Sequence, residues 1–534
     1  MRLGLSLLLA LAGGLHALAL AWPLGELRGQ SHGLLQLVSL VVLAACVSRS
    51  TSPKQALWQT LIFSTSWLTA STWWLYISMH VYGGMPSVLA AVAVILLSFA
   101  LSGLYGLCLW AYRRWVDADA PLLAHVLGFT AAWTLADILR GTVGTGFPWG
   151  AAGYAHIDSP LRHFAPWLGV YGLSGLAAAL AMLLAAPRVP RLASTLASRW
   201  MAAVLVFGLF WMWGASPSQP HEWASRMVAK DMRDTPTALR VSLLQGNVPQ
   251  DLKFGELARD ALQTYQAAML DEDADLVVTP ETALTFLPEQ IPATYWQPLR
   301  EIHDRALLMG LPMRALDSAS TNRAPSYTNS VLGIAPKQAD YRYDKHHLVP
   351  FGEFVPPFFQ WFMAWLHIPM GDFAKGPLPQ APFQWKGQRI GVHICFEDLF
   401  GEELAQSFAD PASSPTLLLN VSNLAWFGDT VALDQHLNIA RMRALELGRP
   451  MLRATNTGAT AVINAQGEVV DALPYETQGV LRAVVHGVDG GNTPYVRWVV
   501  RWGLWPLVLG VLALAVWAVS ISRHSRNGPR RFRS

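Results

Sequence analysis

Long apolar segments lie near both ends of the 534-residue chain, and a polar region separates them. Eight segments are long enough, or nearly so, to cross a hydrocarbon layer of about 30 Å. They are Leu3–Trp22, Gly33–Val47, Leu57–Met79, Val88–Tyr112, Leu122–Leu139, Trp167–Ala186, Trp200–Ala215 and Trp502–Ile521. The pattern predicts about eight transmembrane helices, seven before the polar region and one after it. A cleaved signal peptide is the alternative for the first segment, which Arg2 precedes.

Positive charges mark every second connection between these segments. The residues are Arg49 and Lys54, then Arg113 and Arg114, then Arg188, Arg191 and Arg199, and finally Arg523, Arg526, Arg530, Arg531 and Arg533. Because cytoplasmic connections of membrane proteins are rich in Lys and Arg, these connections are predicted to be cytoplasmic. The polar region then faces outward, into the periplasm if the cell has two membranes. We expect a membrane domain over residues 1–216, a polar domain over 217–492, and a last helix with a cytoplasmic tail over 493–534.

Within the polar region, short apolar strands alternate with segments of helical spacing. The expected strands are Leu239–Gln245, Asp275–Glu281, Arg305–Leu311, Ser330–Ile334, Arg389–Ile394, Thr416–Val421 and Met451–Asn456, and the expected helices are Glu256–Leu270 and His436–Leu447. Such alternation is typical of an α/β core. Asn464 to Gly467 separates two further β-rich runs, Thr460–Ile463 and Glu468–Val470, which predicts a hairpin.

Composition supports a membrane protein. Hydrophobic residues make up 52% of the chain and charged residues 14%, with a mean hydropathy of +0.28, whereas about a quarter of the residues in soluble domains are charged. The net charge of +3 and the absence of a dense basic block outside the tail argue against nucleic acid as a partner. The three cysteines form neither a disulfide framework nor a CxxC site, so we expect no metal and no cofactor.

Cys395 is the one cysteine outside the apolar segments, and it directly follows the predicted strand Arg389–Ile394. A lone cysteine on an apolar strand is more often a packing residue than a nucleophile. Two charged residues change this balance, because Glu281 ends another predicted strand and Lys345 lies in a polar loop. A carboxylate can accept the thiol proton, and an ammonium can stabilise an oxyanion. The neighbouring His346 or His347 is the alternative base.

Several motifs resemble one known family. Pro280-Glu281, the loop from Lys345 to Glu353 and Ile394-Cys395-Phe396-Glu397 are similar to the Glu-Lys-Cys triad of the nitrilase superfamily. Nearly the whole chain resembles the bacterial apolipoprotein N-acyltransferases. The further matching segments are Leu244–Gln250, Ser422–Gly428, Gln435-His436, Ala440–Pro450, Arg453–Gly458, Tyr82–Pro86 and Thr145–Trp149.

The resemblance implies a helical membrane bundle that carries an αββα nitrilase-like domain on the periplasmic side of the bacterial inner membrane. It implies transfer of an acyl chain from a phospholipid, usually phosphatidylethanolamine, to the α-amino group of a diacylglyceryl-modified lipoprotein. Glu281 would then be the base, Lys345 the oxyanion partner and Cys395 the nucleophile that forms a thioester. Glu353 and Glu397 would orient the site.

Three positions depart from the family pattern: Phe396 replaces a frequent Tyr, Leu424 replaces Asp, and Thr279 stands where an aromatic residue is common. These departures concern lid contacts and donor preference, and the triad is complete. Two other functions share the same residues. One is a membrane-anchored amidase or nitrilase, and the other is a lipoprotein-binding factor without catalysis. The aromatic and glycine-rich motifs at Tyr82–Pro86 and Thr145–Trp149 indicate either an interfacial belt or a lipid-entry surface.

Overall fold

The computed structural model describes residues 3–185, 238–253, 255, 257–316, 326–356 and 373–527. Two compact units divide the chain, and we call them the helical unit and the α/β unit. The helical unit contains Met1–Trp73, Val88–Glu222 and Trp502–Ser534, and the α/β unit contains Trp74–Ser87 and Trp223–Arg501. The predicted boundary between residues 216 and 217 lies outside the described residues.

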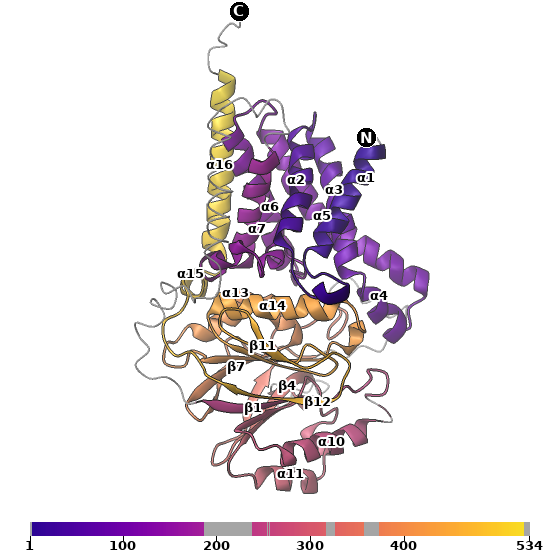
Figure 1. Cartoon of the computed structure of the whole chain (residues 1–534), viewed down its shortest axis with the longest axis vertical. Coiled ribbons are helices and arrows are strands. Elements are labelled where there is room, and N and C mark those ends of the chain that lie inside the picture. The colour runs from indigo at the N-terminus through magenta and orange to yellow at the C-terminus, as the bar shows by residue number, and fades with distance from the viewer. Residues whose placement is uncertain are drawn as a thin grey trace, which may run out of the picture. The chain divides into compact units, whose positions relative to one another are not determined.

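The helical unit is built from long apolar helices (Figure 1). They are α1 (Leu3–Leu18), α2 (Gly33–Ser48), α3 (Pro53–Thr72), α5 (Ser87–Trp115), α6 (Leu122–Thr142), α7 (Ala165–Ala185) and α16 (Trp505–Asn527), with the short helices η1 (Gly25–Leu27), η3 (Ala152–His156) and η4 (Pro160–Phe164) between them. Among the residues that the structure describes, four segments are long and apolar enough to cross a membrane: Ser87–Trp115, Leu122–Thr142, Pro160–Ala185 and Trp505–Arg526.

The predicted number of eight transmembrane helices is not confirmed by these segments. Within the described residues, α1 and α2 are apolar but have only 16 residues each. The predicted span Trp200–Ala215 lies outside the described residues. The described residues thus contain several apolar helices that could span a membrane, as expected for a membrane protein.

The third predicted segment, Leu57–Met79, is wrong at both ends. Helix α3 begins at Pro53 because the Ser52 side chain caps the backbone N–H of Gln55 and proline suits the first helical turn. The helix ends at Thr72. The chain then forms α4 (Leu75–Ile77) and the π-helix η2 (Ser78–Tyr82), and both belong to the α/β unit.

The α/β unit contains two six-stranded sheets. The first has the order β12-β1-β2-β3-β4-β5 and the second the order β11-β10-β9-β8-β7-β6. The strands of the first sheet are β1 (Leu239–Gln245), β2 (Leu276–Val278), β3 (Ala306–Arg314), β4 (Tyr327–Ile334), β5 (Tyr341–Asp344) and β12 (Gly479–Val485). Those of the second are β6 (Phe383–Trp385), β7 (Gln388–Ile394), β8 (Leu417–Ser422), β9 (Met451–Thr455), β10 (Ala461–Ile463) and β11 (Val469–Ala472). The hairpin predicted from Asn464 to Gly467 joins β10 to β11 and is confirmed.

Each sheet has a parallel centre with antiparallel strands at its edges. Strands β1, β2 and β3 are parallel to one another, as are β7, β8 and β9. Every residue of β2 and β8 is buried, as expected for parallel strands that are covered on both faces. The carboxyl ends of the central strands in each sheet therefore lie at one edge.

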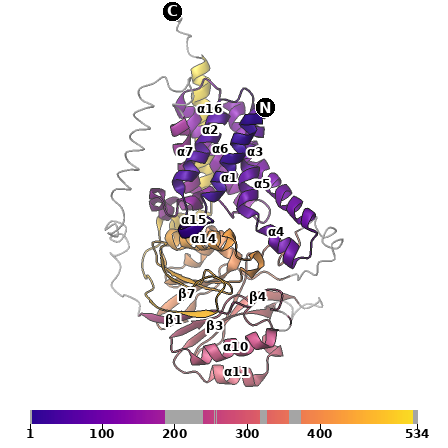
Figure 2. The ribbon, with the colours of Figure 1, turned by 45° about the vertical axis from the view of Figure 1, so that its right-hand side comes forward.

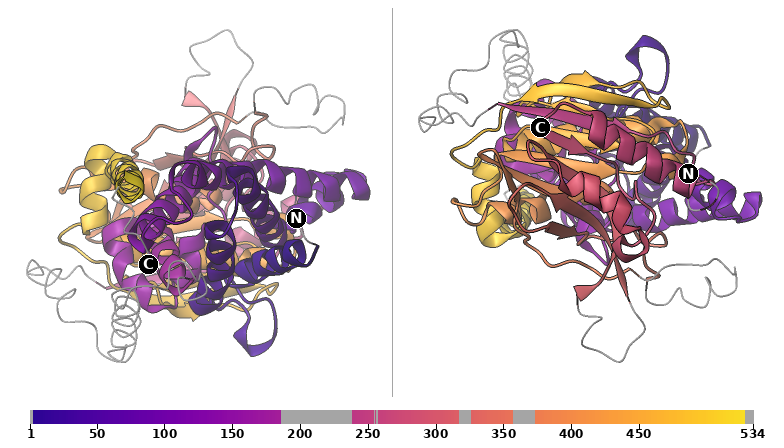
Figure 3. Two further views of the ribbon diagram at one scale, coloured as in Figure 1. Left: turned by 90° about the horizontal axis from the view of Figure 1, so that it is seen from above. Right: turned by 90° about the horizontal axis from the view of Figure 1, so that it is seen from below.

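Helices cover the outer faces of the two sheets (Figures 1–3). One apolar cluster contains residues from both sheets and fills the space between them. A second packs α10 (Ala258–Asp271) and α11 (Ala293–Arg300) against the first sheet. A third packs α14 (Val431–Leu447) and α15 (Pro494–Trp502) against the second sheet. These four layers confirm the predicted αββα arrangement.

Candidate active site

The three residues proposed as a triad follow three different strands. Cys395 directly follows β7, Lys345 directly follows β5, and Glu281 comes three residues after β2. All three side chains lie at the ends of strands because the chain leaves the sheet there and enters polar turns. The predicted positions of Glu281 and Cys395 near the ends of strands are confirmed, and Lys345 begins the polar loop that was predicted for it.

Lys345 joins two of the predicted carboxylates. Its Nζ donates to Oε1 of Glu353 at 2.9 Å and to Oε1 of Glu281 at 3.3 Å, and its side chain is 1% exposed. Asn329 of β4 donates from the same Nδ2 to both carboxylates, at 2.7 Å to Glu281 and 2.8 Å to Glu353. The structure thus brings Glu281, Lys345 and Glu353 into one buried cluster.

Cys395 lies on a sharp turn. Its φ of +51° places a non-glycine residue in the left-handed region, which costs about 1 to 3 kcal/mol. The side chain of Asn420 donates to the Cys395 carbonyl at 3.3 Å, and Nε2 of His436 approaches the same oxygen at 3.2 Å. These contacts hold the strained turn that presents the thiol.

A buried network supports His436 from behind. Arg453 of β9 donates to His436 Nδ1 at 2.8 Å and to Asp398 at 2.8 Å, and Asp398 also bonds to His393 at 2.6 Å. Since Nδ1 accepts from Arg453, the ring proton must be on Nε2, which then donates to Cys395. Burial and the Arg453 charge lower the pKa of His436 to about 3, so this imidazole is neutral and acts as a support.

The Cys395 thiol is protonated in the resting site. Burial raises the pKa of Cys395 well above its ordinary value, Glu281 and Glu353 raise it further, and Lys345 opposes them. A buried thiol in this state would need a base before it could act as a nucleophile. Glu281, the base expected from the sequence, has both carboxylate oxygens bound: one accepts from Lys345 and Asn329, and the other accepts from the backbone N–H of Asn423 at 2.8 Å.

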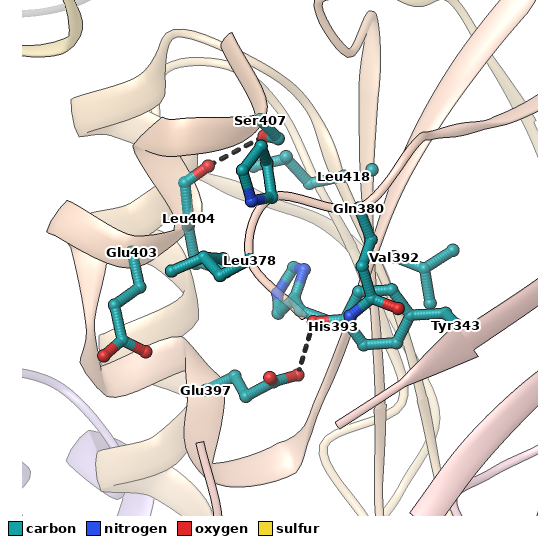
Figure 4. Close-up of a pocket in the computed structure, with 12 residues that line it drawn as sticks. Tyr343, Leu378, Gln380, Val392, His393, Glu397, Glu403, Leu404, Ser407 and Leu418 are labelled. Atoms are coloured by element: carbon teal, nitrogen blue, oxygen red, sulfur yellow. Dashed lines mark hydrogen bonds between the residues drawn. The ribbon is translucent and has the colours of Figure 1, made fainter. Parts of the chain in front are cut away.

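Glu397 has a different role from the other predicted carboxylates. Its Oε1 accepts from the backbone N–H groups of His346 and His347 at 2.7 and 3.2 Å. Its Oε2 accepts from Ile394 at 2.6 Å and from the Tyr343 hydroxyl at 2.9 Å. Glu397 therefore ties the loop after Lys345 to the strand before Cys395. Figure 4 shows this carboxylate beside a small pocket over β7, whose lining does not include the triad residues.

The two histidines considered as alternative bases are held by other groups. The His347 ring stacks on Phe400 with centroids 3.4 Å apart, and its Nδ1 lies 3.0 Å from Glu403. Nδ1 of His346 lies 2.7 Å from the carbonyl of Gly376. These contacts favour Glu281 over His346 and His347 as the base.

The three departures from the family pattern occupy packed positions. The Thr279 hydroxyl accepts from the backbone of Gly310 at 3.1 Å and so links β2 to β3. Phe396 is buried against Phe400, and Leu424 is fully buried. Thr279 thus supports the strand end that carries Glu281, while the other two residues contribute packing.

A loop with exposed aromatic residues follows Asn423. Trp426 and Phe427 lie on η10 (Ala425–Phe427), and Trp426 is 40% exposed. The Ser78 hydroxyl donates to the Trp426 carbonyl at 2.7 Å, and the Trp74 ring lies 4.4 Å from that of Phe427. The motif at Tyr82–Pro86 also contributes, because the Tyr82 ring contacts Trp426 edge-on. These contacts explain why residues 74–87 belong to the α/β unit.

Sequence reasoning missed four polar contributors to the site. They are Lys253, Asn329, His436 together with Arg453, and the backbone N–H of Asn423. His436, Arg453 and Asn423 lie in motifs noted from the sequence, although without a role. Asn329 and Lys253 stand in segments with no chemical pattern. Within the described residues, no group of three or more His, Cys, Asp or Glu side chains is arranged to hold a metal ion.

Comparison with known proteins matches the two units separately. Residues 12–183 match the model of the apolipoprotein N-acyltransferase N-terminal domain, and residues 240–494 match the carbon-nitrogen hydrolase model. The apolipoprotein N-acyltransferase of Verminephrobacter eiseniae is 45% identical, over 97% of this chain and 97% of its own. That of Ralstonia nicotianae is 44% identical, over 91% and 92%. A mutant amidase of the nitrilase superfamily from Nesterenkonia is 20% identical, over 49% of this chain and 95% of its own, with a TM-score of 0.33.

Proposed function

The chain belongs to the apolipoprotein N-acyltransferase family and is an acyltransferase of lipoprotein N-acylation, and on this basis we propose that Glu281, Lys345 and Cys395 perform the transfer through a thioester on Cys395. One observation supports the proposal above the others. Lys345 bridges Glu281 and Glu353 in a buried cluster whose charges all act on the thiol of Cys395. Base, cation and nucleophile are therefore present in one place.

The first displacement loads the acyl chain onto the enzyme. Glu281 accepts the thiol proton while the sulfur attacks the ester carbonyl carbon of a phospholipid, and Lys345 stabilises the oxyanion that develops. The ester C–O bond then breaks. Glu281 returns the proton to the departing glycerol oxygen, and lysophospholipid leaves. Phosphatidylethanolamine is the proposed donor.

The second displacement transfers the chain to the acceptor. The α-amino group of a diacylglyceryl-modified lipoprotein attacks the thioester carbonyl, and Glu281 accepts a proton from the nitrogen. The C–S bond breaks, an amide forms and the Cys395 thiol is regenerated. Glu353 holds Lys345, and Glu397 fixes the two segments that carry Lys345 and Cys395.

The proposed location follows from the two substrates. Both are anchored in the bilayer, so a catalytic domain that acts on them must be tethered to the membrane surface. The charge pattern of the connections supports a periplasmic α/β unit and a cytoplasmic C-terminal tail in the inner membrane.

Intact-protein mass measurement tests the thioester directly. Purified protein incubated with phosphatidylethanolamine should gain the mass of one acyl chain, and hydroxylamine should remove it. Cys395→Ala should stay unmodified, whereas the matched controls Cys46→Ala and Cys108→Ala should be acylated normally. A diacylglyceryl peptide should then discharge the thioester as an amide. Discharge by water alone would favour the amidase alternative, and an active Cys395→Ala protein would favour a binding factor.

A further inference from the structure

Lys253 is a second buried lysine at the site, and the mechanism above does not use it. Its side chain is 2% exposed, and its Nζ donates to the backbone carbonyl of Glu281 at 3.1 Å. Lysine is almost never fully buried without a paired charge. Within the described residues, no ion pair joins Lys253 to a carboxylate. The buried ammonium of Lys253 therefore requires a function for its charge.

The segment that carries Lys253 holds Glu281 from two sides. The Gln250 side chain accepts from Asn423 Nδ2 at 2.7 Å, and the backbone N–H of Asn423 donates to the Glu281 carboxylate at 2.8 Å. Lys253 binds the carbonyl of the same glutamate. Residues 250–253 therefore fix both the backbone and the carboxylate of Glu281.

The charges around Cys395 explain why a second cation is useful. Glu281 and Glu353 face the thiol as two carboxylates, and Lys345 is their shared cation. Behind the thiol, Arg453 is paired with Asp398, and Glu397 is bound by backbone N–H groups. Arg453 also interacts with ionised Cys395, but its charge is matched by that of Asp398. Apart from this pair and Lys253, two carboxylates and one ammonium act on Cys395, an arrangement that opposes a thiolate. The ammonium of Lys253 is a further positive charge that interacts with ionised Cys395.

The charge of Lys253 acts on both reacting groups. Burial lowers the pKa of Lys253 to about 8, while the negative charges of Glu281 and of ionised Cys395 act to raise it. The ammonium form thus predominates below about pH 8 and is stabilised when Cys395 ionises.

We propose that Lys253 is a positioning residue of the transfer reaction, whose ammonium holds the Glu281 carbonyl and whose positive charge stabilises the Cys395 thiolate against two neighbouring carboxylates. This inference rests on the proposed function, because it assumes that a thiolate develops on Cys395. The side chain acts through Glu281 and Cys395 and not on the substrate.

Thiol alkylation measures this effect without substrate. The full chain with Cys46→Ala and Cys108→Ala retains Cys395 alone, and the rate of its reaction with iodoacetamide is measured at about pH 7, where Lys253 carries its proton. Lys253→Gln keeps a hydrogen-bond donor and removes the charge, so less thiolate should form and the alkylation rate should fall by about tenfold. Lys253→Arg keeps the charge, and its rate should stay near that of the parent. Lys386→Gln, an ion-paired surface lysine, is the control and should leave the rate unchanged.

A second experiment removes a neighbouring negative charge, that of Glu353. Glu353→Gln removes a carboxylate that raises the pKa of Cys395, so its alkylation rate at the same pH should rise. The double variant with Lys253→Gln should lie between the two single variants. Lys253→Met provides a second neutral variant if Lys253→Gln does not fold, and thermal unfolding establishes which variants are folded.

The outcomes separate this inference from the proposed function. An unchanged alkylation rate in the neutral variants overturns the role of Lys253, and so do equal rate losses in the Gln and Arg variants, which indicate a structural role. The thioester measurement on the parent protein is independent of both results. A thioester in the parent with no rate loss in Lys253→Gln refutes only this inference. A rate loss without any thioester supports it and refutes the proposed mechanism.

Discussion

Both units of the protein bury charged residues, but the ratio of positive to negative charges differs between the two buried clusters. In the helical unit, Arg140 and Asp137 form a fully buried pair at 3.5 Å. In the α/β unit, Lys345 is shared by Glu281 and Glu353 beside a cysteine. The first arrangement matches one cation with one anion. The second leaves an excess of carboxylate near a group that must lose a proton.

The balanced pair has a structural role. Arg140 donates to the carbonyls of Phe147 and Trp149, each at 2.7 Å, and to the hydroxyl of Tyr105 at 2.9 Å. It therefore fixes the loop that contains the Thr145–Trp149 motif. The α/β cluster shows the opposite design, since its charges act on the pKa of Cys395. Buried charges thus fix a loop in one unit and change the pKa of a cysteine in the other.

The largest expected effect is loss of transfer when the unbalanced cluster is changed. Cys395→Ala should abolish acylation of a diacylglyceryl peptide. Glu281→Gln should lower the rate by about 10²- to 10⁴-fold, the usual contribution of a general base. The assay is product formation by purified protein, with thermal unfolding to show that the fold persists. Near-normal transfer by Glu281→Gln would exclude this carboxylate as the base.

Breaking the balanced pair should affect stability and not chemistry. Asp137→Asn leaves the Arg140 charge without its partner, and such changes typically cost about 3 to 5 kcal/mol. The unfolding midpoint should fall, while transfer per folded molecule should stay within a few-fold of the parent. Glu26→Gln, at an exposed position, is the control. If Asp137→Asn lost transfer without losing stability, the structural role of this pair would be refuted.

Lys253 should give the α/β unit a stability that depends on pH. The pKa of this lysine is about 8 in the folded protein and 10.5 as an unperturbed group. The folded state binds fewer protons between these values, so stability should rise with pH from about pH 8 to above pH 10. The gain is about 3 kcal/mol, relative to Lys253→Met. If the free energy of unfolding changed with pH in the same way in both proteins over this range, this prediction would be wrong.

The smallest effect is expected from the support behind Cys395. His436→Leu removes a donor to the Cys395 carbonyl and the acceptor of Arg453 Nη2, so thioester formation should slow by about tenfold, equivalent to about 1.4 kcal/mol. His436→Gln, which can still donate, should slow it less. Single-turnover acylation measures the step directly. Equal rates for His436→Leu and the parent would show that Asn420 alone holds the turn.

The succession of strands along the chain, and the strand ends near Glu281 and Cys395, were predictable because they depend on local patterns. The strands β2 and β7 are apolar runs that end at polar residues, and the hairpin between β10 and β11 has its own turn signal. The αββα layers also followed from motifs similar to a known family. The roles of Glu281, Lys345, Cys395, Glu353 and Glu397 stay predictions that the experiments above test.

Other features depended on contacts between distant residues. The segment after α3 looked like a continuation of a membrane helix, yet Trp74 and Ser78 contact Phe427 and Trp426 more than 340 positions away. Asn329 joins two carboxylates only because β4 lies between the elements that carry them. No local pattern marks such residues, since their neighbours in sequence do not take part.

The sequence by itself determined the division into apolar and polar regions, the alternation of strands and helices in the polar region, and the residue types on which the proposed acyl transfer depends. These follow from periodicity and from side-chain chemistry, which are properties of short stretches of chain. The tertiary structure decided how the charges combine: which carboxylates share Lys345, how His436 supports the turn at Cys395, and where Lys253 adds a second cation. Electrostatic interactions depend on distance in space, and only the folded chain sets those distances.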